Sequence, residues 1–196
     1  GAGGGPCVTT DGDTVWAFST DGGKKFVYRT DGKSFGSGTG ANRNKGYLPD
    51  GWVTAMANGR GAAGVTLVAV AQRGKIVTKG SRGYVESAAE RIDKISLHDG
   101  ADGKVLAEVP LAGPRGLAVR ADQLYALHAE GEQWAVSVTK LAAAAGASFK
   151  RIFLVPAEIK PADLEVDSHG RFYLSDSEAN KVFQLDESGK VLRSYG

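Results

Sequence analysis

Short runs of alternating hydrophobic and polar residues follow one another along most of this chain. The clearest group occupies residues 161–196, where four β-rich runs read DLEV, RFYLSD, KVFQLD and KVLRSY. The turn-forming segments DSHG, SEAN and ESG separate them. Alternation over four to eight residues between clusters of Gly, Asn, Asp and Ser is typical of half-buried β-strands joined by tight turns. Residues 161–196 are therefore predicted to form four antiparallel strands.

The same order of runs recurs earlier in the chain, which indicates an internal repeat. Residues 114–132 repeat the first half of the last unit, so that Leu117 corresponds to Leu164 and Tyr125 to Tyr173. The opening segment repeats the later part, with TVWAFS, KKFVYRTD and GKSFG in the places of the second, third and fourth strands. A longer unit between them supplies WVTAMAN, VTLVAVAQ, RIDKISL and KVLAEV.

Recurring four-stranded antiparallel units stack radially into a β-propeller, because each twisted sheet covers its apolar face against its neighbours. The sequence therefore predicts an all-β fold, a single propeller or partial propeller domain. Its blades are expected at approximately 6–48, 49–113, 114–160 and 161–196. The alternative, a β-sandwich, has no need of a recurring strand order.

The last unit resembles the NHL repeat family. The resemblance rests on its proline-led first strand, on the core FYLSDSEANKV and on the closing DESGKVLRSYG. It is good over residues 161–196, moderate over residues 114–131, and elsewhere only a pattern of strands. NHL-type domains usually have about six blades. The resemblance thus implies part of a larger propeller, either a fragment of a larger extracytoplasmic bacterial NHL-containing protein or blades completed by another chain.

Composition and charge narrow the classes of function. There are 24 Lys and Arg residues against 22 Asp and Glu, which is not the basic excess of a nucleic-acid-binding domain. One cysteine excludes an internal disulfide and a multi-cysteine zinc site. No apolar run approaches the roughly 20 residues that a membrane helix needs. We therefore expect no nucleic-acid partner and no membrane span; an extracytoplasmic or secreted location is what the resemblance implies.

Blade topology sorts the candidate chemistry between two edges of the propeller. In each blade, the turn from the first to the second strand and the turn from the third to the fourth strand lie at one edge. The connection from the second to the third strand and the connection to the next blade lie at the opposite edge. His98 and His169 belong to the first edge and His128 to the second, so we expect surface histidines that do not share a metal. Cys7 is predicted to be a small core residue, and Asp176 is predicted to brace the turn after it.

The second edge receives two long irregular segments, GSGTGANRNKGYLPDG and QRGKIVTKGSRGYVESAAE. Loops held by rigid blades commonly carry binding function, so this edge is the predicted ligand face. Its candidate ligand-binding residues are Arg43, Lys45, Tyr47, Arg73, Arg82 and Tyr84. Near the central axis, the starts of the first strands are expected to place Asp50, Arg115 and Asp163 around the channel mouth. The alternatives are a solvated loop surface and, for Arg115, a salt bridge to a neighbouring blade.

These observations favour a non-catalytic binding or scaffold propeller that presents its loop-rich face to a protein or a polysaccharide, or to further blades of the same protein. The alternative is part of a six-bladed propeller enzyme, similar to lactonases, strictosidine-synthase-like hydrolases or amidating lyases, with a central metal. Such an enzyme needs inward carboxylates or histidines from several blades. Only Asp50, Arg115 and Asp163 qualify. We therefore expect no catalytic residue, no metal site and no cofactor in this chain.

Overall fold

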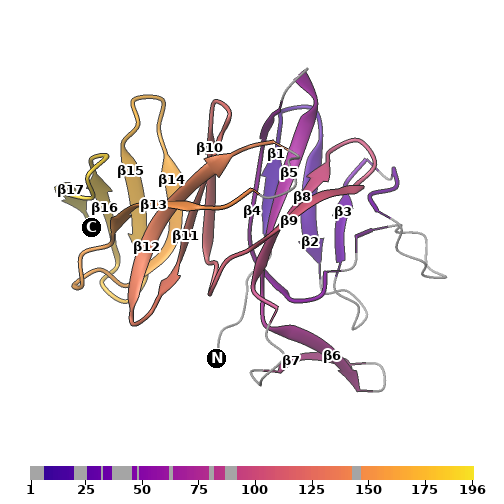
Figure 1. Ribbon diagram of the computed structural model, residues 1–196, viewed down its shortest axis with the longest axis horizontal. Coiled ribbons are helices and arrows are strands. Elements are labelled where there is room, and N and C mark those ends of the chain that lie inside the picture. Colours follow the sequence, from indigo (N-terminus) through magenta and orange to yellow (C-terminus); the bar gives the residue numbers. More distant parts are fainter. Residues whose placement is uncertain are drawn as a thin grey trace.

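The computed structural model is all-β and consists of antiparallel sheets arranged as propeller blades (Figure 1). It describes residues 7–19, 26–31, 33–36, 46–47, 49–61, 64–79, 82–86, 92–142 and 147–196. Blade 1 contains β1 (Val8–Thr10), β2 (Val15–Ser19) and β3 (Phe26–Arg29). Blade 2 contains β4 (Trp52–Arg60), β5 (Thr66–Arg73), β8 (Lys94–Asp99) and β9 (Val105–Pro110). A separate hairpin, β6 (Lys75–Lys79) with β7 (Arg82–Glu86), is inserted between β5 and β8.

The two C-terminal blades have four strands each, in sequence order. Blade 3 contains β10 (Gly116–Arg120), β11 (Gln123–Glu130), β12 (Gln133–Lys140) and β13 (Lys150–Leu154). Blade 4 contains β14 (Pro161–Val166), β15 (Phe172–Asp176), β16 (Lys181–Leu185) and β17 (Val191–Tyr195). All four strands predicted for the last unit are thus confirmed.

The innermost strands β1, β4, β10 and β14 lie side by side in this order. Asp163 of β14 also lies near enough to Cys7, just before β1, to contribute to the raised pKa of that thiol after the larger effect of burial. The two ends of the row therefore approach each other across an axis. The predicted all-β propeller architecture is confirmed.

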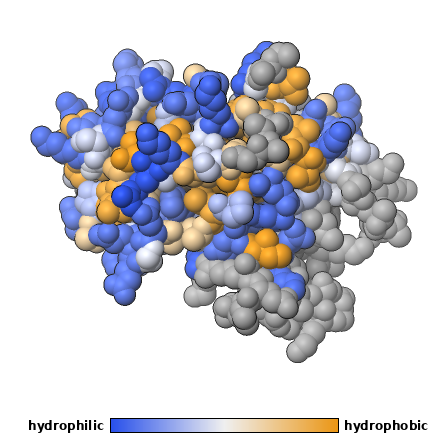
Figure 2. All heavy atoms as spheres, viewed as in Figure 1, coloured by the Kyte–Doolittle hydropathy of each residue, from blue (hydrophilic) through white to orange (hydrophobic). Residues whose placement is uncertain are grey.

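Among the described residues, three apolar cores lie between successive blades. Alternate residues of each strand point to opposite faces of its sheet, so one strand can contribute to two cores. In blade 3, Leu117 and Leu124 pack toward blade 2, whereas Ala118 and Tyr125 pack toward blade 4. Charged and polar atoms cover much of the surface of blades 3 and 4 in Figure 2, with hydrophobic areas among them. Each blade is therefore stabilised mainly through its neighbours, as expected of a repeat architecture.

The outer edge of blade 1 differs from the prediction. GKSFG was expected to form its fourth strand, but residues 33–36 form no strand, and Tyr47 pairs with Val27 of β3 instead. The backbone N–H of Gly36 donates to the carbonyl of Asp102, and the Phe35 side chain is fully buried. The segment packs on the β8–β9 turn of blade 2, because burying its one aromatic ring there is favourable.

In the part of the chain that the structure describes, no helix is long and apolar enough to cross a bilayer.

Candidate functional site

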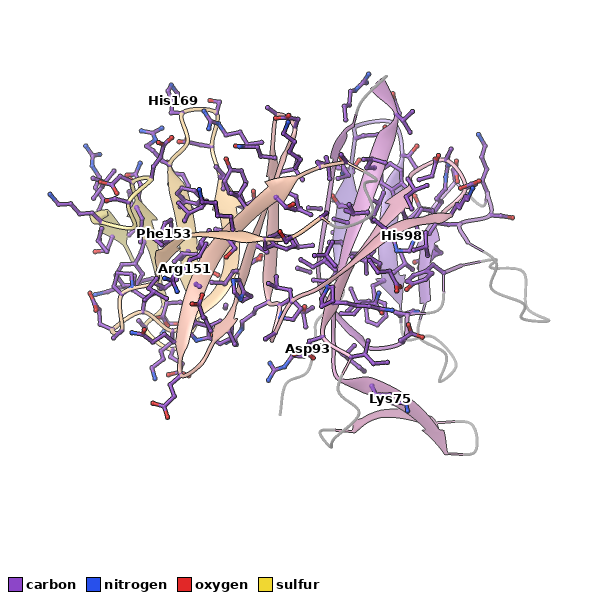
Figure 3. All side chains as sticks on the ribbon, in the orientation of Figure 1. Lys75, Asp93, His98, Arg151, Phe153 and His169 are labelled. Atoms are coloured by element: carbon purple, nitrogen blue, oxygen red, sulfur yellow. The ribbon has the colours of Figure 1, made fainter. Side chains whose placement is uncertain are left out.

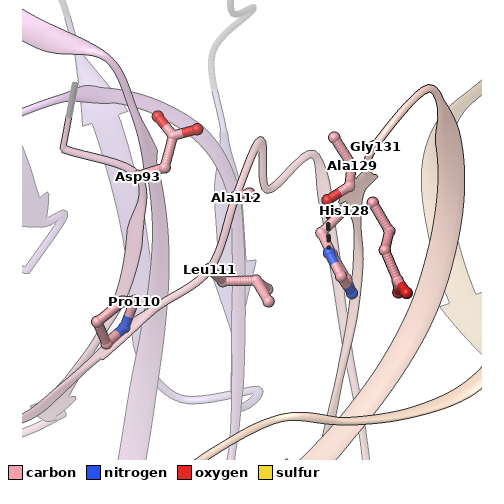
Figure 4. A pocket seen from close by; sticks show the side chains of 8 residues that line it. Asp93, Pro110, Leu111, Ala112, His128, Ala129 and Gly131 are labelled. Carbon is pink, nitrogen blue, oxygen red and sulfur yellow. Dashed lines mark hydrogen bonds between the residues drawn. The ribbon is translucent and has the colours of Figure 1, made fainter. Parts of the chain in front are cut away.

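A groove of about 660 Å³ lies between blades 2 and 3 (Figure 4). One wall is the segment that joins β9 to β10, and the other is the turn between β11 and β12. It is lined by Asp93, Pro110, Leu111, Ala112, His128, Ala129, Glu130 and Gly131. Both connections belong to the edge where the sequence analysis expected ligands to bind. The residues of the groove were nevertheless not among the predicted ligand-binding residues.

Backbone hydrogen bonds hold the floor of the groove. The N–H of Ala129 donates to the carbonyl of Ala112 at 3.1 Å, which ties the two walls together. The N–H of Gly113 donates to Asp93 Oδ2 at 2.6 Å. Gly113 has a φ of 53°, and a Cβ at this position would lie 2.8 Å from the Ala129 Cβ. A glycine is therefore required for the close approach of the two walls.

Charged groups form the rim of the groove, whereas its lining is largely apolar. The Asp93 carboxylate also accepts from the N–H of Gly74 at 2.8 Å, so it bridges two backbone segments. Glu130 forms an ion pair with Arg151 of β13, and both side chains remain partly exposed to solvent. Figure 3 shows Asp93 and Lys75 toward one edge of the molecule and His169 at the opposite edge. An apolar floor with a polar rim is the usual composition of a protein interface.

His128 in the groove wall is a buried, hydrogen-bonded residue. Because a carbonyl only accepts, the contact of 3.0 Å to the Ala129 carbonyl assigns the proton to Nδ1. Nε2 then accepts from the Ser137 hydroxyl at 2.8 Å. Burial lowers the pKa of His128 and favours the neutral ring. Both nitrogens are engaged, so the ring supports the wall and is not poised to transfer a proton.

His98 repeats this arrangement in blade 2. Its Nδ1 lies 3.1 Å from the Gly103 carbonyl and its Nε2 lies 2.8 Å from the Ser96 hydroxyl. The prediction of surface histidines is therefore wrong for His98 and His128, whose residues are 0% and 7% exposed, and right for His169. In each case a serine hydroxyl on the same face forms a hydrogen bond with Nε2 of the buried ring. The sequence contained a signal for His98, because the serine stands two residues before it in the strand.

Tyr47 and Asp50, two of the predicted ligand-binding residues, meet around Gln72 at the joint between blades 1 and 2. The amide nitrogen of Gln72 donates to the Tyr47 hydroxyl at 3.0 Å, and its oxygen accepts from the N–H of Asp50 at 3.0 Å. Lys94 Nζ lies 2.6 Å from Asp50 Oδ2 and 2.7 Å from Glu108 Oε1. Desolvation opposes the charge on Lys94, but these two carboxylates outweigh it and raise the pKa of the ammonium.

Arg115 and Asp163 take part in different contacts. The guanidinium of Arg115 lies over the ring of Trp134 in its own blade, 5.0 Å from the centroid, which is a cation–π geometry. Partial desolvation by neighbouring atoms raises the pKa of Asp163 and of Glu165, although both residues are exposed, and the Asp163 charge also contributes to the shift of Glu165. Burial, followed by the Asp163 charge, raises the pKa of the Cys7 thiol to about 11.

The structure thus places Asp50, Arg115 and Asp163 in three separate sets of contacts, so a joint role at the channel mouth stays a prediction. Of the other candidates, Arg73 ends β5, and Arg82 and Tyr84 belong to β7. Arg43 and Lys45 lie outside the described residues.

Asp176 has the structural role predicted for it. Its carboxylate accepts from the backbone N–H groups of Lys160, Glu178 and Ala179, which lowers the pKa of the carboxyl. Across the described residues, no group of three or more His, Cys, Asp or Glu side chains is arranged to hold a metal ion.

No family model and no curated protein matches the chain. Two solved structures are similar in fold. A gluconolactonase from Xanthomonas campestris superposes with a TM-score of 0.56 at 13% sequence identity, over 93% of this chain and 57% of the gluconolactonase. A chain of a nidogen/laminin complex superposes with a TM-score of 0.53 at 12% identity, over 96% of this chain and 78% of that chain. This chain therefore spans little more than half the length of the gluconolactonase. Both likenesses support the propeller fold, while membership of the NHL family stays a prediction.

Proposed function

We propose that this chain is a non-catalytic binding propeller that holds an extended segment of a protein partner in the groove between blades 2 and 3. The observation that carries the proposal is the largely apolar lining of the groove, whose two walls are joined by the Ala129–Ala112 backbone hydrogen bond and bordered by Asp93 and the Glu130–Arg151 pair. Apolar surface enclosed by a polar rim is typical of a site that binds another protein.

The titratable groups of the groove support binding over catalysis. A general acid or base needs a proton-transfer atom that can reach the substrate. Both nitrogens of His128 are engaged with Ala129 and Ser137, and the Asp93 carboxylate accepts from two backbone N–H groups. These groups fix the shape of the groove.

A protein segment suits the groove better than a polysaccharide. Sugar rings commonly stack on the rings of Phe, Tyr and Trp, and none of the eight lining residues is one of these. One of the propellers of similar fold comes from a complex with laminin, so a propeller of this type can take a protein partner. An extracytoplasmic or secreted location, which the NHL resemblance implies, is part of the same proposal.

The test is an array of peptides about seven residues long, with two central leucines and varied flanks, which span about 23 Å when extended. Ala112→Arg places a bulky charge in the groove and should abolish peptide binding. Ala157→Arg changes another exposed alanine, outside the groove, and should bind like the wild-type chain. Hydrogen exchange should show protection of residues 111–113 and 129–131 when peptide is bound. Equal binding by both variants, or binding of polysaccharides but not of peptides, contradicts the proposal.

A second candidate, an enzyme with a central metal, is favoured by one observation. Asp163 and Glu165 lie two residues apart on the inner strand β14, and partial desolvation raises the pKa of both carboxyls although both residues are exposed. Such carboxyls at the axis of a propeller are suited to acid–base chemistry. Metal analysis of the purified chain and a lactone-hydrolysis assay test this candidate. Hydrolysis that is lost in Asp163→Asn supports it, and the absence of both metal and hydrolysis rejects it.

A further inference from the structure

One face of blade 4 carries mainly polar residues. The core between blades 3 and 4 buries Leu164, Leu174 and Leu185, and the residues that alternate with these lie on the opposite face of the sheet. Blade 4 stands at one end of the molecule in Figure 1. In the pairing register, this opposite face carries two rows across the four strands: Asp163, Ser175, Val182 and Tyr195, and then Glu165, Tyr173, Gln184 and Arg193. We call these eight residues the polar face of blade 4.

The polar face differs from the surfaces through which successive blades pack. On blade 3, the row that meets blade 4 contains Leu127, Val136 and Phe153, which are paired across the sheet and buried. On the polar face of blade 4, the two acidic residues and the arginine are exposed. Charged groups lose favourable hydration when an apolar surface covers them. The polar face is therefore suited to a ligand that offers hydrogen bonds.

Hydrogen bonds hold the two tyrosines of the polar face in place. The Tyr195 hydroxyl donates to Gln184 Oε1 at 3.2 Å, and Gln184 Nε2 donates to the Tyr173 hydroxyl at 3.1 Å. The Tyr173 hydroxyl donates in turn to Asp167 Oδ2 at 3.2 Å, and Arg171 Nε lies 2.6 Å from the same oxygen. Gln184 is 5% exposed, whereas Tyr195 is 48% exposed. The buried amide thus fixes the orientation of a tyrosine that is half-exposed to solvent.

Charges of both signs lie on the polar face. Arg193 precedes Tyr195 by two residues on β17, whereas Glu165 lies in the row of Arg193 on β14, at the other side of the sheet. The backbones of Glu165 and Arg193 are three strand spacings apart, about 14 Å. A charged ligand that spans this distance meets a like charge at one end. A neutral ligand with hydroxyl groups does not, because a hydroxyl donates to a carboxylate and accepts from a guanidinium.

The chemistry of a sugar fits this arrangement. A sugar ring stacks its apolar side on an exposed tyrosine ring, and its hydroxyl groups form hydrogen bonds with charged side chains. A protein partner fits less well, because the centre of a protein interface is depleted of charged residues and Val182 is the only aliphatic member of the polar face. We propose that the polar face of blade 4 binds a neutral oligosaccharide, with one sugar ring stacked on Tyr195 and hydroxyl groups bonded to Arg193 on one side and to Glu165 on the other. This binding does not depend on the peptide groove between blades 2 and 3.

The experiment measures the affinity of the full chain for neutral oligosaccharides of glucose, mannose, galactose and N-acetylglucosamine by isothermal titration calorimetry. We expect at least one of these series to bind the wild-type chain. Tyr195→Ala should bind the same oligosaccharide about 10-fold or more weakly, because the stacking surface is lost. Tyr195→Phe keeps the ring and should retain most of the affinity. The control, Leu192→Ala, removes another half-exposed side chain of β17 and should leave the affinity unchanged.

Nuclear magnetic resonance locates the bound oligosaccharide on the chain. The backbone amide signals of residues 182–184 and 193–195 should shift when it binds, since these residues form the outer part of the polar face. The signals of residues 111–113, in the groove between blades 2 and 3, should not shift. Shifts confined to the groove would place the sugar there and contradict the proposal.

Three results of the affinity measurements overturn the proposal. The first is that none of the neutral series binds, and the second is that Tyr195→Ala binds as tightly as the wild type. The third is that oligosaccharides of uronic acids bind more tightly than the neutral ones. A peptide whose binding is lost in Tyr195→Ala but kept in Ala112→Arg assigns this face to a protein partner and also overturns the proposal.

Discussion

The joint between blades 3 and 4 and the joint between blades 1 and 2 are held together in different ways. At the first joint, aromatic rings meet edge to face: Phe172 lies 5.1 Å from Phe153 and 5.5 Å from Tyr125, between ring centroids. At the second joint, polar contacts accompany the apolar core. The indole N–H of Trp16 donates to the Gly100 carbonyl at 3.1 Å, and Asn58 donates to Thr9 at 2.7 Å.

The difference lies in what each joint depends on. Burial of apolar area is non-directional and insensitive to pH, whereas buried polar groups must keep all their partners. At the joint between blades 1 and 2, Gln72, Ser96 and His98 form a chain in which every residue is fully buried. We therefore expect the joint between blades 3 and 4 to respond to loss of volume, and the joint between blades 1 and 2 to respond to protonation and to loss of single hydrogen bonds.

The largest effect is expected for Phe172→Ala. The ring is 2% exposed and packs against both Phe153 and Tyr125, so its removal leaves a cavity in the core between blades 3 and 4. The free energy of unfolding should fall by about 3–5 kcal/mol in denaturant titration. Leu192→Ala in the same blade is the control, because that side chain is 47% exposed and should change stability by less than about 0.5 kcal/mol. Similar losses for the two variants would contradict the role assigned to this joint.

An intermediate effect is expected from mild acid. Burial lowers the pKa of His98 in the folded chain, against an unperturbed value of about 6.5 when unfolded. Below that value the unfolded chain binds more protons, so stability decreases as the pH falls, by at most about 1.4 kcal/mol per pH unit for each such histidine. Above about pH 6.5 the ring is neutral in both the folded and the unfolded chain, so this dependence of stability on pH is absent.

Denaturant titrations between about pH 7 and pH 5 measure this slope, in a range that lies above the unperturbed pKa of Asp and Glu. Groups facing His98 include Tyr47, Phe35, Lys94 and Glu108. His98→Gln should flatten the slope and His169→Gln, at an exposed position, should not. An unchanged slope in His98→Gln would show that another group titrates; His128, whose pKa is also lowered, is the next to replace.

The smallest effect concerns the hydrogen bond between Asn58 and Thr9, which links the inner strands β4 and β1. A double-mutant cycle with Asn58→Ala and Thr9→Ala should give a coupling energy of about 0.5–1.5 kcal/mol, the usual net value of one hydrogen bond. A cycle with Asn58→Ala and the exposed Ser168→Ala should give none. A zero coupling for the first pair would mean that the apolar core alone holds this joint.

The strands of blade 4 were predictable because their determinants are local. Alternation gives each strand, and the Asp-led turns close through their own side chains: Asp167 accepts from the N–H groups of His169 and Arg171, and Asp186 from those of Ser188 and Lys190. Each of these contacts spans at most four residues. A pattern in the sequence can therefore be converted directly into structure at these positions.

Other features were not predictable because they depend on contacts between distant segments. Tyr47, not GKSFG, continues the sheet of blade 1, and Phe35 is buried against blade 2. The groove exists only because Ala112 and Ala129, from different blades, approach each other closely. The PLAGP segment at the end of β9 was a weak signal for the groove, since it is apolar and lacks the alternation of apolar and polar residues that is typical of a strand.

The sequence by itself determined the repeat, the antiparallel strands and the edge to which each connection belongs, because alternation and turn chemistry act over a few residues. Only the tertiary structure decided which histidines are buried and where the groove lies. These features depend on how neighbouring blades pack, and packing brings together residues whose separation along the chain carries no local signal.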